Sequence, residues 1–132
     1  MDVISIGGLR IDNVSMEEAV SRCMALAASG GGAVFTPNAE MAKDALDNPE
    51  FMALLNRGDL VIPDGIGVVA AAKLLKTPLK GKVPGCDLAQ RLLPELEKAG
   101  YGLFLFGSKP GVAESARDEI LRRHPNLIIS GV

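Results

Sequence analysis

The chain has 132 residues, of which 48% are hydrophobic and 23% charged, so its size and composition predict one folded domain and exclude disorder. The formal net charge is −2 and aromatic residues make up 4%, which excludes a strongly basic surface or a base-stacking surface for nucleic acid. The two cysteines have no metal-site spacing, which favours reduced thiols in a cytoplasm.

The sequence predicts neither secretion nor a membrane span. Asp2 stands where a secretory signal carries basic residues. The longest charge-poor stretch, residues 24–40, is interrupted by three glycines and a proline, which a span of about 20 apolar residues would not tolerate. A soluble chain is therefore expected.

The first predicted elements are a strand pair and a helix. Two short apolar runs, residues 3–6 and 9–11, flank a pair of glycines, which predicts a β-hairpin or a bulged strand. Ser15 followed by Glu18 is a capping box, so a helix is expected to begin there. Gly30 is expected to end this helix because glycine adopts positive φ without strain.

A short buried strand is predicted over residues 33–35, followed by two helices. Pro37 suits the first position of a helix, where its missing N–H costs nothing. Asn48 and Pro49 repeat that start signal, and Gly58 is expected to end the second helix.

The next elements are a strand over residues 60–62 and helices over 65–76 and 87–98. Pro94 lies inside the last of these helices and is expected to kink it or split it.

The C-terminal part repeats the alternation, with a strand over 103–106, a helix from 112 to about 123, and a strand over 127–132. Short apolar strands that alternate with longer helices predict an α/β fold. We expect a mostly parallel, Rossmann-like sheet covered by helices, with an N-terminal β-hairpin. The chain stops directly after a strand, so it is expected to be part of a longer, incomplete domain.

Polar residues follow three of the predicted strands. The segments are TPNAE after residue 35, PDG after residue 62 and GSKPG after residue 106. Ligands gather at the carboxyl ends of parallel strands, where helix N-termini present free N–H groups. If the sheet is parallel, one edge brings together Thr36, Asn38, Asp64, Ser108 and Lys109.

Each of these residues has a structural alternative. Asp64 is suited to act as a general base at a strand end, but it could equally cap the helix that follows. Thr36 and Asn38 either bind a hydroxyl-rich ligand or cap a helix, and cap preferences favour the second reading. The turn of Gly107, Ser108 and Lys109 resembles a phosphate-binding turn, although ordinary turn chemistry is the commoner explanation.

Four segments together carry a family resemblance. In this order and spacing, FTPNAEM, VIPDGIGVV, KVPGCDL and LFLFGSKPGVAE resemble the WecG/TagA/CpsF family of bacterial glycosyltransferases, nearest to its TagA branch. The similarity runs over essentially the whole chain. It implies transfer of N-acetylmannosamine from its UDP donor to undecaprenyl-diphosphate-linked N-acetylglucosamine, in wall teichoic acid or surface polysaccharide synthesis.

The resemblance also implies residue roles for an inverting, metal-independent transfer. Asp64 matches the aspartate proposed as the base, and Thr36 and Asn38 match the Thr-Pro-Asn motif expected to line the sugar pocket. Lys82 stands where the family usually has an arginine, and it keeps the charge but loses the bidentate fork. The predicted catalytic residues are thus Asp64 and Thr36, and the predicted substrate-binding residues are Asn38, Lys82, Gly107, Ser108 and Lys109.

The implied partners are a UDP-sugar donor and an undecaprenyl-linked acceptor lipid, with no cofactor, no metal ion and no nucleic acid. A cytoplasmic location at the inner face of the cell membrane is implied, together with peripheral membrane contact. A homo-oligomer is expected to cover the exposed apolar edge of a truncated domain. Residues 1–132 are expected to form a single domain that lacks the family's C-terminal portion. The alternative is a non-catalytic nucleotide- or sugar-binding module on the same scaffold.

Overall fold

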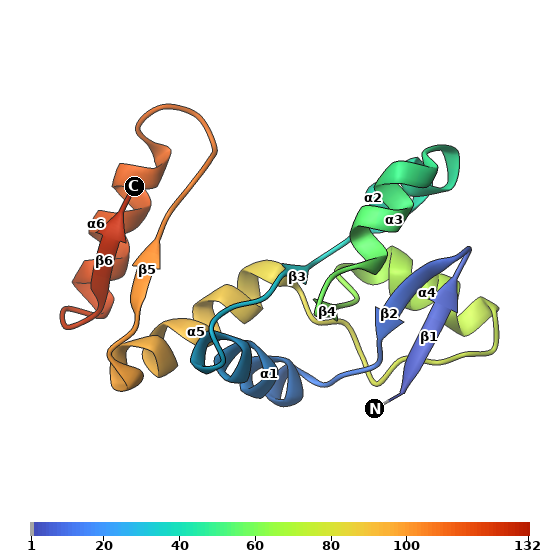
Figure 1. Cartoon of the computed structure of the whole chain (residues 1–132), viewed down its shortest axis with the longest axis horizontal. Helices are drawn as coiled ribbons and strands as arrows, with labels where there is room; N and C mark the ends of the chain where they lie inside the picture. Colours follow the sequence, from blue (N-terminus) through green and yellow to red (C-terminus); the bar gives the residue numbers. More distant parts are fainter. Residues whose placement is uncertain (1) are drawn as a thin grey trace. The chain divides into compact units, whose positions relative to one another are not determined.

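The computed structural model describes residues 2–132, apart from the side chain of Ile66. It divides the chain into two compact units, one up to Leu88 and one over residues 89–132 (Figure 1). Helices alternate with short strands in both units, so the α/β class and the N-terminal hairpin are confirmed. Strand pairing forms three two-stranded sheets, β1 with β2, β3 with β4 and β5 with β6.

The hairpin joins β1 (Val3–Ile6) and β2 (Leu9–Asp12) in antiparallel register. Gly7 and Gly8 have φ of +59° and +93°. Two consecutive residues with positive φ form the tight turn whose twist matches that of the flanking strands, which explains the glycine pair.

Helix α1 (Met16–Ala28) begins with the predicted capping box. The Ser15 hydroxyl accepts from the Glu18 N–H at 3.2 Å, and the Glu18 carboxylate accepts from the Ser15 N–H at 2.7 Å. The helix ends just before Gly30, which has φ of +102°, as the sequence predicts.

Strands β3 (Val34–Phe35) and β4 (Leu60–Val61) pair in parallel, so the predicted direction is confirmed for this pair. The chain between them forms α2 (Ala39–Asp47) and α3 (Pro49–Asn56). The Phe35 carbonyl accepts from the Ile62 N–H at 2.9 Å, which extends the pairing by one residue beyond β4.

One helix start differs from the sequence prediction. Pro37 was expected at the first position of α2, but the helix begins after Asn38, whose side chain accepts from the Met41 N–H at 2.9 Å. Asparagine is a strong N-cap, so the helix starts at the residue after it and Pro37 lies outside. Pro49, by contrast, occupies the first turn of α3 behind the cap of Asn48, as predicted.

Helices α4 (Ile66–Leu74) and α5 (Gly85–Ala99) follow β4. Helix α5 begins two residues earlier than predicted and runs continuously through Pro94, so splitting is excluded. Proline has no N–H to donate, so α5 continues past Pro94 with one helical hydrogen bond fewer. No helix among residues 2–132 is long and apolar enough to cross a membrane.

The second unit contains most of α5, then β5 (Gly102–Phe104), α6 (Val112–Arg123) and β6 (Ile128–Gly131). Strands β5 and β6 are parallel, with an irregularity between Leu103 and Phe104. Side chains of α5, β5 and α6 line an apolar cavity of about 460 Å³.

The tightest core lies in the first unit. The hairpin, α2, α3, β4 and α4 contribute a cluster of buried residues, namely Leu9, Ile11, Ala45, Leu55, Val61 and Val68. Full burial of one large aliphatic side chain contributes roughly 1.5–3 kcal/mol to the free energy of unfolding. This cluster includes Val61 of β4, and Phe35 of β3 packs against it, so it stabilises this strand pair.

Candidate functional site

The ends of β3 and β4 bring two predicted site residues to one place. Thr36 directly follows β3, and Asp64 lies three residues beyond β4. Because Phe35 pairs with Val61 in parallel register, both segments leave the sheet in the same direction. Both side chains are half-buried.

The first residue of α5 lies against both side chains. The Gly85 N–H donates to Asp64 Oδ2 at 3.3 Å. A Cβ atom at Gly85 would lie 3.1 Å from Thr36 Oγ1 and 3.3 Å from Asp64 Oδ2. Thr36, Asp64 and Gly85 are therefore neighbours, although they are far apart in sequence.

The backbone beneath this cluster is held firmly. The side chains of Pro37 and Pro63 are fully buried, and Ile62 is buried completely. The Val83 N–H donates to the Pro63 carbonyl at 2.9 Å, which ties the segment before α5 to the segment after β4. The site therefore lies on buried, hydrogen-bonded backbone and not on an exposed loop.

The helix-cap alternative is wrong for Asp64 and for Thr36. Gly65 is the N-cap residue of α4 and supplies no side-chain cap, while the Asp64 carboxylate accepts from Gly85 instead. Asn38, not Thr36, caps α2. The roles of Asp64 as a base and of Thr36 as a ligand-binding residue stay predictions.

The capping alternative is confirmed for Asn38. Its Oδ1 atom accepts from the Met41 N–H, and the residue is exposed. A side-chain amide has donors as well as an acceptor, so capping occupies only its oxygen. A second role of the amide nitrogen toward a ligand stays a prediction.

Lys82 lies in the first unit, three residues before Gly85, and its side chain is exposed. Across the part of the chain that the structure describes, it has no hydrogen-bond or ion-pair partner. Its charge is therefore not committed to a neighbouring carboxylate.

The predicted phosphate-binding turn belongs to the second unit. Gly107 and Ser108 have φ of +107° and +68°, and Gly111 caps α6 without a side-chain bond. The Lys109 carbonyl accepts from the Val112 N–H at 3.1 Å, which is ordinary turn pairing. The turn does precede a helix N-terminus, as predicted, but whether it joins Thr36 and Asp64 stays a prediction.

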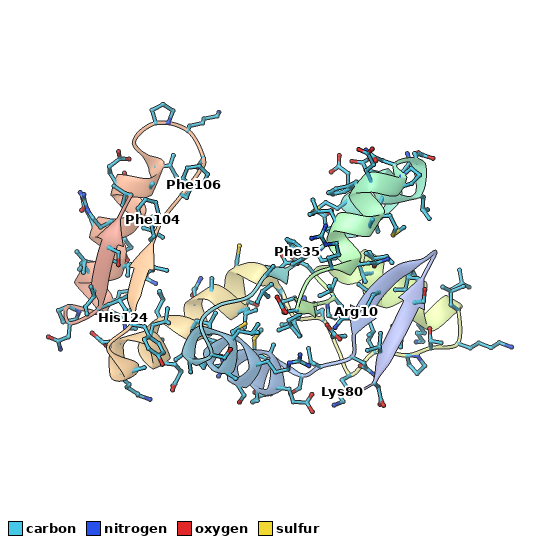
Figure 2. The ribbon with its side chains drawn as sticks, in the orientation of Figure 1. Arg10, Phe35, Lys80, Phe104, Phe106 and His124 are labelled. Atoms are coloured by element: carbon cyan, nitrogen blue, oxygen red, sulfur yellow. The ribbon has the colours of Figure 1, made fainter. Side chains whose placement is uncertain are left out.

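Sequence reasoning missed a buried carboxylate that fixes β4. Asp12 is fully buried, and its Oδ2 atom accepts from the Val61 N–H at 2.8 Å. Arg10 donates to both carboxylate oxygens, at 2.9 and 3.0 Å, and to the Gly58 carbonyl at 2.7 Å (Figure 2). The signal was available, because two opposite charges two residues apart share one face of an otherwise apolar strand.

A second missed contact positions the segment that leads to Lys82. The Lys80 N–H donates to Asn13 Oδ1 at 2.7 Å, and the Lys80 ammonium pairs with Glu18. The hydrogen bond from Lys80, ahead of the one from the Ser15 backbone, lowers the pKa of Glu18. Within residues 2–132, no group of three potential metal-ligating side chains is present.

The comparisons with known proteins agree on one family. Residues 4–132 match the profile of the glycosyl transferase WecG/TagA/CpsF family. A Bacillus spizizenii protein named N-acetylglucosaminyldiphosphoundecaprenol N-acetyl-beta-D-mannosaminyltransferase is 33% identical over 101 residues, which cover 76% of this chain and 39% of the relative. A Bacillus subtilis protein of the same name is 31% identical over the same length, covering 76% and 40%.

A Staphylococcus aureus protein of that name is 28% identical over 127 residues, covering 94% of this chain and 50% of the relative. The chain therefore spans about half, or less, of the length of the curated relatives that it matches.

Proposed function

Because the chain belongs to the WecG/TagA/CpsF family of glycosyl transferases, we propose that its protein transfers N-acetylmannosamine from UDP-N-acetylmannosamine to undecaprenyl-diphosphate-linked N-acetylglucosamine. The names of the relatives specify this sugar and this acceptor for those proteins. The observation that carries the proposal is the cluster of Thr36, Asp64 and Gly85 at the ends of β3 and β4. The reaction would serve wall teichoic acid or surface polysaccharide synthesis.

Asp64 is the proposed general base. Its Oδ2 atom accepts from the Gly85 N–H, and Oδ1 has no protein partner among the described residues, so Oδ1 is the oxygen that takes the proton. As the acceptor hydroxyl loses its proton to Asp64, its oxygen bonds to the anomeric carbon and UDP departs from the opposite face. General-base catalysis of this kind contributes roughly 10²–10⁴-fold to the rate.

Thr36 and Asn38 are proposed to orient the sugar. The Thr36 hydroxyl and the Asp64 carboxylate both lie within 3.3 Å of the Cβ position at Gly85, so a hydroxyl group bound by Thr36 would be held near the base. Asn38 uses Oδ1 to cap α2, which leaves its amide nitrogen to donate to a sugar hydroxyl or acetamido oxygen. In this proposal, Asn38 both caps α2 and binds the sugar.

The leaving diphosphate needs positive charge or N–H donors as its negative charge develops. We assign this task to Lys82 and to the turn of Gly107, Ser108 and Lys109, which precedes α6. Lys82 is exposed and uncommitted, and the turn carries a hydroxyl and an ammonium group. No metal ion is required in this scheme.

The proposed acceptor is a membrane lipid, so the protein would act at the cytoplasmic face of the cell membrane through peripheral contact. Self-association into a homo-oligomer is also proposed, since Phe104, Phe106 and Ile128 expose apolar side chains. The rival function is a binding module that recognises the UDP-sugar without transferring it.

The test is a transfer assay on the protein as encoded, with labelled UDP-N-acetylmannosamine and a synthetic lipid-diphosphate N-acetylglucosamine. The proposal predicts a labelled disaccharide lipid and release of UDP. UDP-N-acetylglucosamine serves as the control donor and should give much less product. Binding of UDP without any product would instead favour the binding module.

A further inference from the structure

We propose that Gly85 is a positioning residue of this site, in two ways. Its N–H holds one oxygen of the Asp64 carboxylate, and its missing side chain leaves the space in which Thr36 and Asp64 lie together. The inference rests on the proposed function, because it concerns how the proposed base is held.

The space at Gly85 is tight on two sides. A Cβ atom there would lie 3.1 Å from Thr36 Oγ1, 3.2 Å from Thr36 Cγ2 and 3.3 Å from Asp64 Oδ2. All three distances are shorter than most contacts that a Cβ atom makes in proteins, so the neighbouring atoms would have to move by a few tenths of an ångström. An added methyl group would therefore push on both Thr36 and Asp64.

Glycine is needed here for space and not for backbone conformation. Unlike Gly65, Gly85 does not have positive φ. Gly81 lies four residues earlier in the same segment, also without positive φ, and a Cβ atom there would meet nothing within 4 Å. The two glycines therefore form a matched pair, one crowded and one open.

The backbone on either side of Gly85 is held in place by hydrogen bonds. The Val83 N–H is bonded to the Pro63 carbonyl at 2.9 Å, and the Leu88 N–H is bonded to the Pro84 carbonyl at 2.9 Å. Moving Gly85 away from Asp64 would strain one of these bonds. The cheaper response to a methyl group is rotation of the Thr36 or Asp64 side chain.

Such a rotation would affect the reaction more than the binding of the donor. The Gly85 N–H fixes Oδ2, so it sets the direction in which Oδ1 faces the acceptor hydroxyl. A misplacement of about 1 Å in a reacting group can cost about 10²-fold in rate. The loss is expected mainly in kcat, because the base is displaced while, of the groups assigned to the UDP-sugar, only Thr36 is touched and Asn38, Lys82 and the turn of residues 107–109 are not.

The experiment measures kcat and KM for UDP-N-acetylmannosamine in the protein as encoded, with Gly85→Ala and the control Gly81→Ala. We expect kcat to fall about 10- to 100-fold in Gly85→Ala, with KM changed by no more than about twofold, and both constants to be retained in Gly81→Ala. In an Asp64→Asn background, Gly85→Ala should cause little further loss, because the two changes disable one unit.

A rescue variant separates positioning from folding. Thr36→Ser removes the methyl group that the new Cβ would meet at 3.2 Å and keeps the hydroxyl. Gly85→Ala combined with Thr36→Ser should therefore recover part of kcat relative to Gly85→Ala. Recovery of folding, measured by circular dichroism, without recovery of kcat would overturn the proposal, as would failure of both variants to fold.

The outcomes distinguish this inference from the function on which it rests. If the unchanged protein makes no product, the proposed function fails. If it makes product and Asp64→Asn slows it while Gly85→Ala does not, only the role of Gly85 is refuted. A rise in KM with unchanged kcat in Gly85→Ala would also refute it.

Discussion

The two parallel strand pairs of this molecule have similar sequence signals but very different surroundings. Leu60, Val61 and Ile62, in and after β4, are completely buried, and the segment that follows β4 is hydrogen-bonded to β3 and to the segment before α5. In the second unit, Phe104 is 58% exposed and Phe106 is 95% exposed (Figure 2). Parallel strands are normally covered on both faces, so only the first pair has the support that a precise site requires.

The polar contacts of the two units also differ in burial. In the first unit, the Asp12 carboxylate bridges β2 and β4 from a fully buried position. In the second unit, the ion pairs along α6 are local and exposed, as between Glu119 and Arg122 one turn apart, and the contact of His124 with Glu97 of α5, at 3.6 Å, is only partly buried. Buried polar contacts between distant segments fix relative positions, whereas exposed pairs within a helix contribute little.

The largest expected difference between the two regions concerns apolar burial. Leu60→Ala should lower the free energy of unfolding by roughly 3–4 kcal/mol, because it removes a fully buried side chain and leaves a cavity. Phe106→Ala removes a larger but exposed side chain and should change it by no more than about 0.5 kcal/mol. Urea denaturation measures both, and equal losses would contradict the comparison.

The next effect concerns the buried carboxylate. Asp12→Ala should cost about 2–3 kcal/mol of unfolding free energy, because the buried Val61 N–H loses its acceptor and Arg10 loses its counter-charge. The matched change in α6, Asp118→Ala, removes an exposed carboxylate paired with Arg117 and should cost less than about 0.5 kcal/mol. A loss at Asp118 as large as that at Asp12 would show that the buried bridge has no special role.

A smaller effect separates the two roles of Asn38. Asn38→Ala removes the α2 cap and should cost about 1 kcal/mol of stability. Asn38→Asp keeps an oxygen acceptor for the Met41 N–H and removes the amide donor, so it should keep stability but weaken binding of UDP-N-acetylmannosamine. Unchanged donor binding in the Asp variant, measured by calorimetry, would leave Asn38 with a capping role only.

The smallest effect is the pH dependence of an exposed cluster on α6. Hydrogen bonds from Arg122 and then Arg123 lower the pKa of Glu119 to about 2, from an ordinary value of 4.5. Because the folded pKa is the lower one, the stabilisation is complete above pH 4.5 and is lost as the pH falls toward 2. The difference in Tm between the unchanged protein and Glu119→Gln should therefore shrink as the pH falls from 4.5 toward 2. A difference that grows as the pH falls would contradict the lowered pKa of Glu119.

Local features of the fold could be predicted from the sequence because their signals lie within a few residues. The Gly7-Gly8 turn, the Ser15 capping box and the Asn48-Pro49 helix start all depend on neighbouring side chains and backbone. Pro37 was misplaced by two residues because two start signals, a proline and an asparagine, compete in adjacent positions.

The site could be predicted only in part. The strand-end rule places Thr36 and Asp64 together because it depends on strand direction alone. The contact with Gly85 could not be predicted, since it depends on where a third segment returns after α4. Asp12 was missed because a charged residue is normally expected at the surface, and its burial depends on partners in β2 and β4.

The most direct test of the proposed mechanism is the rate of N-acetylmannosamine transfer by Asp64→Asn, with a change at the exposed Asp44 of α2, Asp44→Asn, as the control. If Asp64 is the base, kcat should fall about 100-fold or more in Asp64→Asn with UDP affinity retained, and Asp44→Asn should leave both unchanged. Transfer by Asp64→Asn at the rate of the unchanged protein would show that this carboxylate is not the base.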